Sequence, residues 1–303
     1  MMENFAIMKP FNLTFFAVTA FFVLLLVGAT FLMKHKSDKA KRIVIASAAI
    51  LTLIGFVFYK YFLSIDAEYN VLTASKGGFN WWGELPLQLC NINMLLIPIA
   101  VLFNIEMLMS FCFFVGSIGA TMAIVMPGMG FSDCSIFLPR MLGYFGTHYM
   151  IVIMAIAIVS FGLYRPKYRD FPRTCLTIFG ISFCVFLINE LFIQTGVFTD
   201  ANYFYTMNPE GNPLLELFHR LIPVPFLYLL PSLLILLPYM AVVTLGFWLA
   251  DRKKAALPTA ATAEAIPAPA EETATAEEEI PAPAEETAPA EEETALAEEM
   301  SEN

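Results

Sequence analysis

Long apolar runs recur along this chain, and they constrain its fold more than any other feature. A helix needs about 20 consecutive apolar residues to cross a bilayer. Seven stretches of that kind occur, near residues 11–33, 43–63, 86–103, 107–126, 141–163, 174–196 and 222–250. Lipid offers no hydrogen bonds to a bare backbone, so each spanning segment must be helical. The sequence therefore predicts an all-α fold, a polytopic membrane bundle of about seven transmembrane helices.

Basic residues predict how this bundle is oriented. Three short segments, KHKSDKAKR, YRPKYRDFPR and DRKK, hold twelve of the seventeen lysines and arginines. They follow the first, fifth and seventh predicted spans, so they lie on one side of the membrane. Cytoplasmic loops carry an excess of Lys and Arg. The pattern therefore predicts an outside N-terminus and a cytoplasmic C-terminus.

The C-terminal 49 residues differ sharply in composition from the rest. Residues 255–303 contain fourteen glutamates and no basic residue, and they repeat IPAPAEETA from Ile266 and from Ile280. A segment rich in Ala, Pro and Glu cannot bury a core. We therefore expect two parts: a transmembrane domain over residues 1–254 and a disordered acidic cytoplasmic tail over residues 255–303. A structural protein whose tail recruits basic partners by charge stays open; the protein partners are unknown.

Strongly polar side chains within three predicted spans are the main functional signal, because such groups are costly in lipid unless they face the bundle interior. They are Gln88, Cys90, Asn91 and Asn93 in the third span, Thr147 and His148 in the fifth, and Asn189, Glu190 and Gln194 in the sixth. With 1.5 Å of rise per residue, Cys90 and His148 lie roughly 6–10 Å below their outer helix ends and Asn189 about 10 Å below its own. The three helices therefore place polar groups in one outer layer.

A thiol and an imidazole in one layer suggest a specific chemistry. A thiol reacts as thiolate, and a neighbouring base makes thiolate available. We predict Cys90 as a nucleophile, His148 as its base, and Asn91 and Asn189 as groups that hold an oxyanion or orient the imidazole. The remaining candidates are polar or aromatic residues that line the pocket: Gln88, Asn93, Glu190, Asn202, Tyr203 and Tyr205.

Two plainer interpretations compete with this reaction centre. A single cysteine in a membrane helix usually serves as a small packing residue, and His and Asn side chains also join helices by hydrogen bonds. Alternatively, the Gln, Asn, His and Glu cluster belongs to a membrane protein that binds or transports a small polar solute or an ion, because acids within spans serve that role.

Several other function classes are not expected. Composition alone, with 58% hydrophobic and 15% charged residues, argues against an ordinary soluble domain. The five cysteines have neither metal-ligand nor disulfide spacing, and no phosphate loop, HExxH, GxSxG or nucleic-acid motif occurs. We therefore expect no metal, no cofactor and no nucleic-acid partner.

Five motifs resemble a known family. LPLQLCNI, VGSIGATMAIVMP, FGTHYM, INELF with the following NYFYTMNP, and PVPFLY are similar to the YwaF-type bacterial integral membrane proteins, which are related to eukaryotic transmembrane protein 164. The resemblance runs from about Trp82 to Tyr228. It implies a seven-helix bundle and a cysteine-dependent acyltransferase that moves fatty acyl chains onto lysophospholipids, with membrane lipids as substrate. It also implies a multi-pass protein of the plasma membrane, in bacteria the cytoplasmic membrane.

The resemblance carries over to individual positions. Its cysteine corresponds to Cys90, its histidine to His148 and its asparagine to Asn189, and its NYMY-like segment corresponds to residues 202–205. Two positions depart from the pattern, since Gln88 stands where histidine is more common and Phe204 replaces the methionine.

Overall fold

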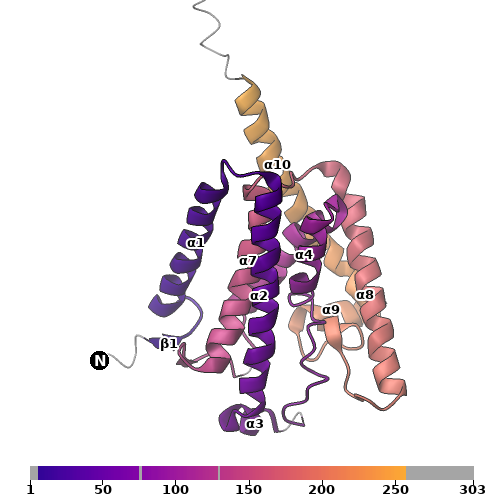
Figure 1. Cartoon of the computed structure of the whole chain (residues 1–303). Helices are drawn as coiled ribbons and strands as arrows, with labels where there is room; N and C mark the ends of the chain where they lie inside the picture. Colours follow the sequence, from indigo (N-terminus) through magenta and orange to yellow (C-terminus); the bar gives the residue numbers. More distant parts are fainter. Residues whose placement is uncertain (1–5, 75–76, 129, 257–303) are drawn as a thin grey trace, which may run out of the picture. The chain divides into compact units, whose positions relative to one another are not determined.

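The computed structural model describes residues 6–74, 77–128 and 130–256, and it forms a bundle of α-helices (Figure 1). Within the described residues, six helical segments are long and apolar enough to cross a membrane. They span Leu13–Met33, Asp38–Ser64, Glu106–Val125, Pro139–Ser160, Tyr168–Thr195 and Leu227–Lys253. The predicted helical membrane bundle is therefore confirmed. The predicted tail, apart from its first two residues, lies outside the described residues.

The spanning segments start where local sequence favours a helix. The Asn12 side chain caps α1 (Leu13–Met33) by accepting a hydrogen bond from Phe15 N at 2.8 Å. Ser37 caps α2 (Asp38–Ser64) in the same way, and α7 (Pro139–Ser160) begins with proline, whose missing N–H costs nothing in a first turn. Helix α8 (Phe171–Gln194) follows the short 3₁₀ turn η4 (Tyr168–Asp170).

Two spans contain irregular backbone. One is built from α5 (Glu106–Phe111), the π-helical η3 (Cys112–Gly116) and α6 (Ser117–Val125). The last begins with the 3₁₀ segment η6 (Leu227–Ser232) and continues as α10 (Leu233–Ala256). Its start is later than the predicted residue 222, because the amphipathic helix α9 (Pro213–Leu221) and a turn come first.

The third predicted span is wrong in its first part. We expected a helix over residues 86–103, but α4 covers only Asn93–Leu102, and residues 86–92 form turns instead. Ten helical residues rise about 15 Å, half of what a hydrocarbon core requires. The turns bond their own carbonyls locally: those of Gln88, Cys90 and Asn91 accept from backbone amides three or four residues later, and that of Leu89 accepts from the Asn93 side chain.

The elements at one end of the bundle are short. They include β1 (Ile7–Met8) and β2 (Cys134–Ser135), which pair antiparallel, the helices α3 (Ala67–Thr73) and α9, and η5 (Tyr203–Tyr205). Buried Arg140, at the start of α7, binds Asp66 at 2.9 Å and Glu68 at 2.8 Å. These ion pairs join α7 to α3 at this end.

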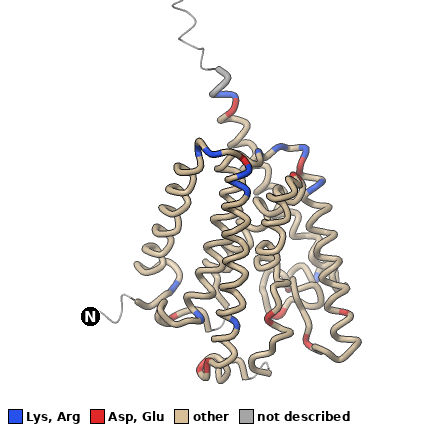
Figure 2. Tube along the Cα trace, viewed as in Figure 1, with Lys and Arg blue, Asp and Glu red and all other residues tan. Residues whose placement is uncertain are grey.

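The three basic segments named above lie together at the opposite end (Figure 2). The predicted alternation of loops requires this arrangement. Which side of the membrane this end faces stays a prediction.

Helices α2 and α7 pack closely along their lengths at the centre of the bundle. Their closest approach depends on Gly143 of α7. A Cβ atom built there would lie 2.3–2.5 Å from atoms of the buried Tyr59 side chain, whereas one at Gly146 would meet nothing within 4 Å. Tyr59 Cβ and Cγ cannot move away without shifting α2, so only glycine fits at residue 143.

We expect Gly143→Ala to lower the free energy of unfolding by about 1–3 kcal/mol, because it overpacks this helix contact. Gly146→Ala, one turn away on the same helix, is the matched control and should not destabilise the protein. Thermal unfolding in detergent compares the two, and equal stability would contradict the close-packing argument.

Candidate functional site

Cys90 and His148 meet in the structure. The Cys90 sulfur lies 3.3 Å from His148 Nε2, within hydrogen-bond distance for sulfur. Cys90 comes from the turns that precede α4, and buried His148 lies nine residues into α7. Segments that are 58 residues apart in sequence therefore supply the two groups. The sequence predicted that Cys90 and His148 lie at similar depth in the membrane, and in the structure their side chains are in direct contact.

A second hydrogen bond fixes which nitrogen of His148 carries the proton. His148 Nδ1 lies 2.7 Å from the carbonyl oxygen of Tyr144. A carbonyl oxygen can only accept, so Nδ1 is the protonated donor. In the neutral ring, Nε2 then has a free lone pair, and it faces the thiol. This is the tautomer that a base needs in order to take the proton from Cys90.

Tyr144 holds the imidazole in place in two further ways. Its ring centre lies 4.4 Å from that of His148, and the same ring stacks on Phe131 at 4.3 Å. Its hydroxyl donates to the carbonyl of Ala123 at 2.9 Å, which anchors the ring to α6. Sequence analysis did not single out Tyr144; its position one helical turn before His148 was the available signal.

Two predicted asparagines lie beside the pair. The Asn91 side-chain oxygen is 3.6 Å from the Cys90 sulfur, so this amide contacts the reactive atom. Asn93 is fully buried and donates to the carbonyl of Leu89 at 2.9 Å. Its Oδ1 has no hydrogen-bond partner within the described residues, and it lies against Gly116 of η3.

Asn189 does not reach the Cys90–His148 pair. Its NH₂ group donates to the Tyr203 carbonyl at 2.9 Å and to Thr206 Oγ1 at 2.7 Å, and its oxygen accepts from Tyr203 N at 3.0 Å. Both donor hydrogens are used, so none is left for an oxyanion. The side chain instead fixes the turn at residues 203–206, a role that residue type alone did not reveal.

Gln88 binds the same turn. Its Oε1 accepts from Phe204 N at 2.9 Å. Phe204 and Tyr205 both have positive φ, 62° and 55°, a left-handed conformation that costs roughly 1–2 kcal/mol for each such residue. The Tyr228 hydroxyl bonds the carbonyl of Tyr205. Hydrogen bonds from separate elements therefore stabilise a strained turn and join it to the segment that carries Cys90.

The structure places the other predicted pocket residues, Asn202, Tyr203, Tyr205 and Glu190, in different surroundings. Asn202 organises the loop that follows it through bonds to Asn208 and Glu210. The Tyr203 hydroxyl is buried without a hydrogen-bond partner in the described part of the chain. Burial, together with the Glu84 carboxylate, raises the pKa of Tyr203, so the phenol stays neutral. Tyr205 is partly exposed, and half-buried Glu190 makes no hydrogen bond or ion pair among the described residues.

A buried ion pair lies near the site, and the sequence alone did not predict it. Lys60 of α2 is 8% exposed, and its ammonium binds the Glu84 carboxylate and donates to the Tyr59 hydroxyl at 3.2 Å. The signal was a lysine close to the outer end of an apolar span and a glutamate directly before LPLQLC. Among the described residues, no three His, Cys, Asp or Glu side chains are grouped to hold a metal ion.

Comparison with known proteins gives one match. The family model described as the TMEM164 family covers residues 7–244, which includes the first five spanning segments, most of the sixth and the Cys90–His148 pair. The chain belongs to the TMEM164 family. No curated protein and no solved structure gives a significant match. For this TMEM164-family protein, membership and the six apolar segments establish a multi-pass membrane protein.

In this TMEM164-family chain, Asn189→Leu should destabilise the turn at residues 203–206, because it leaves the buried amide of Tyr203 unpaired and removes the bonds to the Tyr203 carbonyl and to Thr206. We expect a loss on the order of 2 kcal/mol or more. Limited proteolysis of the loop at residues 197–212 should be faster. Glu190→Gln is the adjacent control and should leave proteolysis unchanged; equal rates for both variants would argue against the anchoring role of Asn189.

Glu84→Gln should lower the free energy of unfolding by about 3–5 kcal/mol, because it leaves the Lys60 ammonium buried and unpaired. Adding Lys60→Met to Glu84→Gln removes that charge and should restore much of the loss. Thermal unfolding of the single and double variants measures the difference. A double variant no more stable than the single one would rule out an unpaired charge as the cause.

Proposed function

We propose that this protein is a membrane-embedded acyltransferase that moves a fatty acyl chain between lipids through a thioester on Cys90. The observation that carries the proposal is the 3.3 Å contact between the thiol and the free lone pair of His148 Nε2. A nucleophile, a base within hydrogen-bond reach, and a third group that orients the base form the general pattern of covalent acyl transfer.

In the first half-reaction, His148 Nε2 takes the proton from the Cys90 thiol. The thiolate attacks the carbonyl carbon of a lipid ester, a C–S bond forms, and the C–O bond to the lipid breaks. The leaving alkoxide takes the proton from the imidazolium and departs as a lysolipid. The acyl chain remains as a thioester on Cys90.

The second half-reaction reverses these roles on another lipid. His148 takes the proton from the hydroxyl of the acceptor, and the oxygen attacks the thioester carbonyl. The C–S bond breaks, the new ester leaves, and the thiolate recovers its proton from the imidazolium. Neither half-reaction requires an oxidant or a cofactor.

Nearby groups support the charges that develop in these steps. The Asn91 amide lies against the sulfur, and a 180° rotation about its terminal bond presents NH₂ in place of oxygen, a donor suited to an oxyanion. Cys90 also lies three residues before the start of α4, and a helix N-terminus favours negative charge. The positive Lys60 favours the negative charge of the Cys90 thiolate.

A lipid substrate suits the position of the site. Cys90 and His148 lie among apolar spanning helices, with His148 about 14 Å of helix from the end of α7 that is opposite the basic segments. With the predicted orientation this is the outer side, where a lipid ester carbonyl lies just below the headgroup. We infer a plasma-membrane location on the same grounds, and the cytoplasmic membrane if the source is bacterial.

Binding or transport of a polar solute is the weaker alternative. That function needs polar side chains that are free to meet a solute. Here the amides of Gln88, Asn189 and Asn202 are engaged by the loop at residues 202–210. Glu190 makes no contact with them among the described residues.

Labelling with a lipid-like acyl probe that reacts with thiols tests the acyltransferase. The wild type should form a hydroxylamine-sensitive adduct, Cys90→Ser should form none, and His148→Ala should label about 100-fold more slowly or less, as expected for loss of a general base. Exposed Cys184 is an accessible thiol, so Cys184→Ser is the matched control and should label like the wild type.

Two results would overturn the assignment. Labelling that persists in Cys90→Ser would place the reactive thiol elsewhere. Equal labelling of wild type and His148→Ala, with both folded by thermal unfolding, would show that the imidazole does not activate the thiol.

A further inference from the structure

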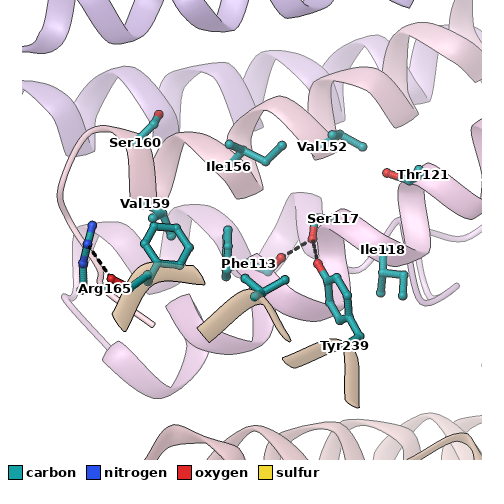
Figure 3. Close-up of a pocket in the computed structure, with 12 residues that line it drawn as sticks. Phe113, Ser117, Ile118, Thr121, Val152, Ile156, Val159, Ser160, Arg165 and Tyr239 are labelled. Carbon is teal, nitrogen blue, oxygen red and sulfur yellow. Dashed lines mark hydrogen bonds between the residues drawn. The ribbon is translucent and has the colours of Figure 1, made fainter. Parts of the chain in front are cut away.

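A groove of about 630 Å³ lies between the spanning helices and is open on one side (Figure 3). Its volume is in the range of about 300–1,000 Å³ that is typical of small-ligand sites. Six of its lining side chains are apolar residues of α6, α7 and α10: Ile118, Val152, Ile156, Val159, Val243 and Phe247. Cys90 and His148 do not line it.

The polar side chains of the groove mostly bond one another or the backbone. Ser117 bonds the carbonyl of Phe113 and the Tyr239 hydroxyl, the latter at 3.1 Å (Figure 3). Ser160 bonds Thr30 at 3.0 Å. The groove therefore offers little to a polar solute, and its apolar walls match hydrocarbon.

The groove begins next to the Cys90–His148 pair. Val152 is one helical turn beyond His148, and Ile156 and Val159 continue on the same face of α7. From the other side, Asn93 follows Cys90 by three residues and lies against Gly116, which directly precedes the lining residue Ser117. Two elements thus lead from the reactive pair to the near end of the groove.

The far end of the groove is lined by charged side chains. Arg165 lies about 18 Å of helix beyond His148, past the end of α7 at Ser160. Its guanidinium binds Asp251 and packs over the Phe247 ring at 4.7 Å from the ring centre. The two side chains are 40% and 53% exposed, so a hydrocarbon chain that extended farther would leave apolar surroundings for charged groups in contact with solvent, where it gains no favourable burial.

We propose that this groove holds the acyl chain carried on Cys90, and that the Arg165–Asp251–Phe247 end limits the length of that chain. The inference rests on the proposed function and adds a binding site for the hydrocarbon part of the substrate. The carbonyl end lies at the Cys90–His148 pair, and the methyl end points toward Arg165. The open side lets a chain enter laterally from the bilayer.

Neighbouring residues of α10 provide a matched test. Val243 lines the groove, whereas Val242 is 70% exposed on the outer surface. We would measure Cys90 acylation by 4-nitrophenyl butyrate and 4-nitrophenyl palmitate, using intact-protein mass spectrometry. Val243→Trp should lower the palmitate-to-butyrate rate ratio by about tenfold or more, because even one methylene without space changes specificity this much. Val242→Trp should keep the wild-type ratio.

A second variant works in the opposite direction, so that misfolding cannot imitate the result. Phe247→Ala removes the ring at the closed end and should raise the rate with 4-nitrophenyl behenate, a longer chain, relative to palmitate. An unchanged chain-length profile in both Val243→Trp and Phe247→Ala would overturn the proposal, as would equal shifts in Val243→Trp and Val242→Trp.

Photocrosslinking separates this inference from the acyl-transfer chemistry. Palmitic acid with a terminal diazirine, added to Cys90→Ala protein, reports on the groove without any reaction at residue 90. Crosslinks within residues 152–160 and 239–251 that disappear in the Cys90→Ala, Val243→Trp double variant would support the groove even if wild-type Cys90 is never acylated. Crosslinks confined to other surfaces would overturn it.

Discussion

The arrangement of this protein depends on satisfying the backbone of residues 86–92, which leave helical geometry between apolar spans. Irregular backbone at membrane depth is tolerated only where protein supplies the hydrogen bonds. Here local backbone turns and the Asn93 side chain bond the carbonyls of residues 88–92. The turn at residues 203–206 lies against this segment, and its own amides are held by Gln88 and Asn189. The strain of two left-handed residues is the cost of this fit. In return, Cys90 is held in a turn before α4, facing α7.

The polar residues around Cys90 and the turn at residues 203–206 therefore divide into two groups. Cys90, His148 and Asn91 form the group to which we assign the proposed chemistry, and they are joined by contacts at the sulfur. Gln88, Asn189 and Asn202 form the supporting group, and their amides hold loops rather than ligands. The supporting group fixes the position of the thiol, and the helical geometry of α7 fixes the imidazole through the carbonyl of Tyr144.

Helix α7 contributes to each part of the proposed mechanism. Its first turn is tied to α3 by Arg140, Gly143 allows α2 to approach, and His148 supplies the base. One turn farther, Val152 begins the wall of the groove. A rigid helix that carries both the base and the wall keeps the reactive carbonyl and its chain in register, which is the preorganisation that catalysis requires.

The sequence by itself determined the class of fold, because the lengths of the apolar segments and the positions of the basic loops are local properties, and a bilayer selects spanning helices by them. It also singled out Cys90 and His148, whose side chains are in contact in the structure, since ionisable groups stand out within apolar spans. It predicted a third span that is too long, because the contacts of residues 86–92 with Phe204 and His148 are not visible in the local pattern. It also gave Asn189 a role in the chemistry, because the partners of its amide, Tyr203 and Thr206, are more than ten residues away in the sequence. The tautomer of His148, the Lys60–Glu84 pair and the groove were decided only by tertiary structure, since each depends on distances between helices that no local pattern encodes.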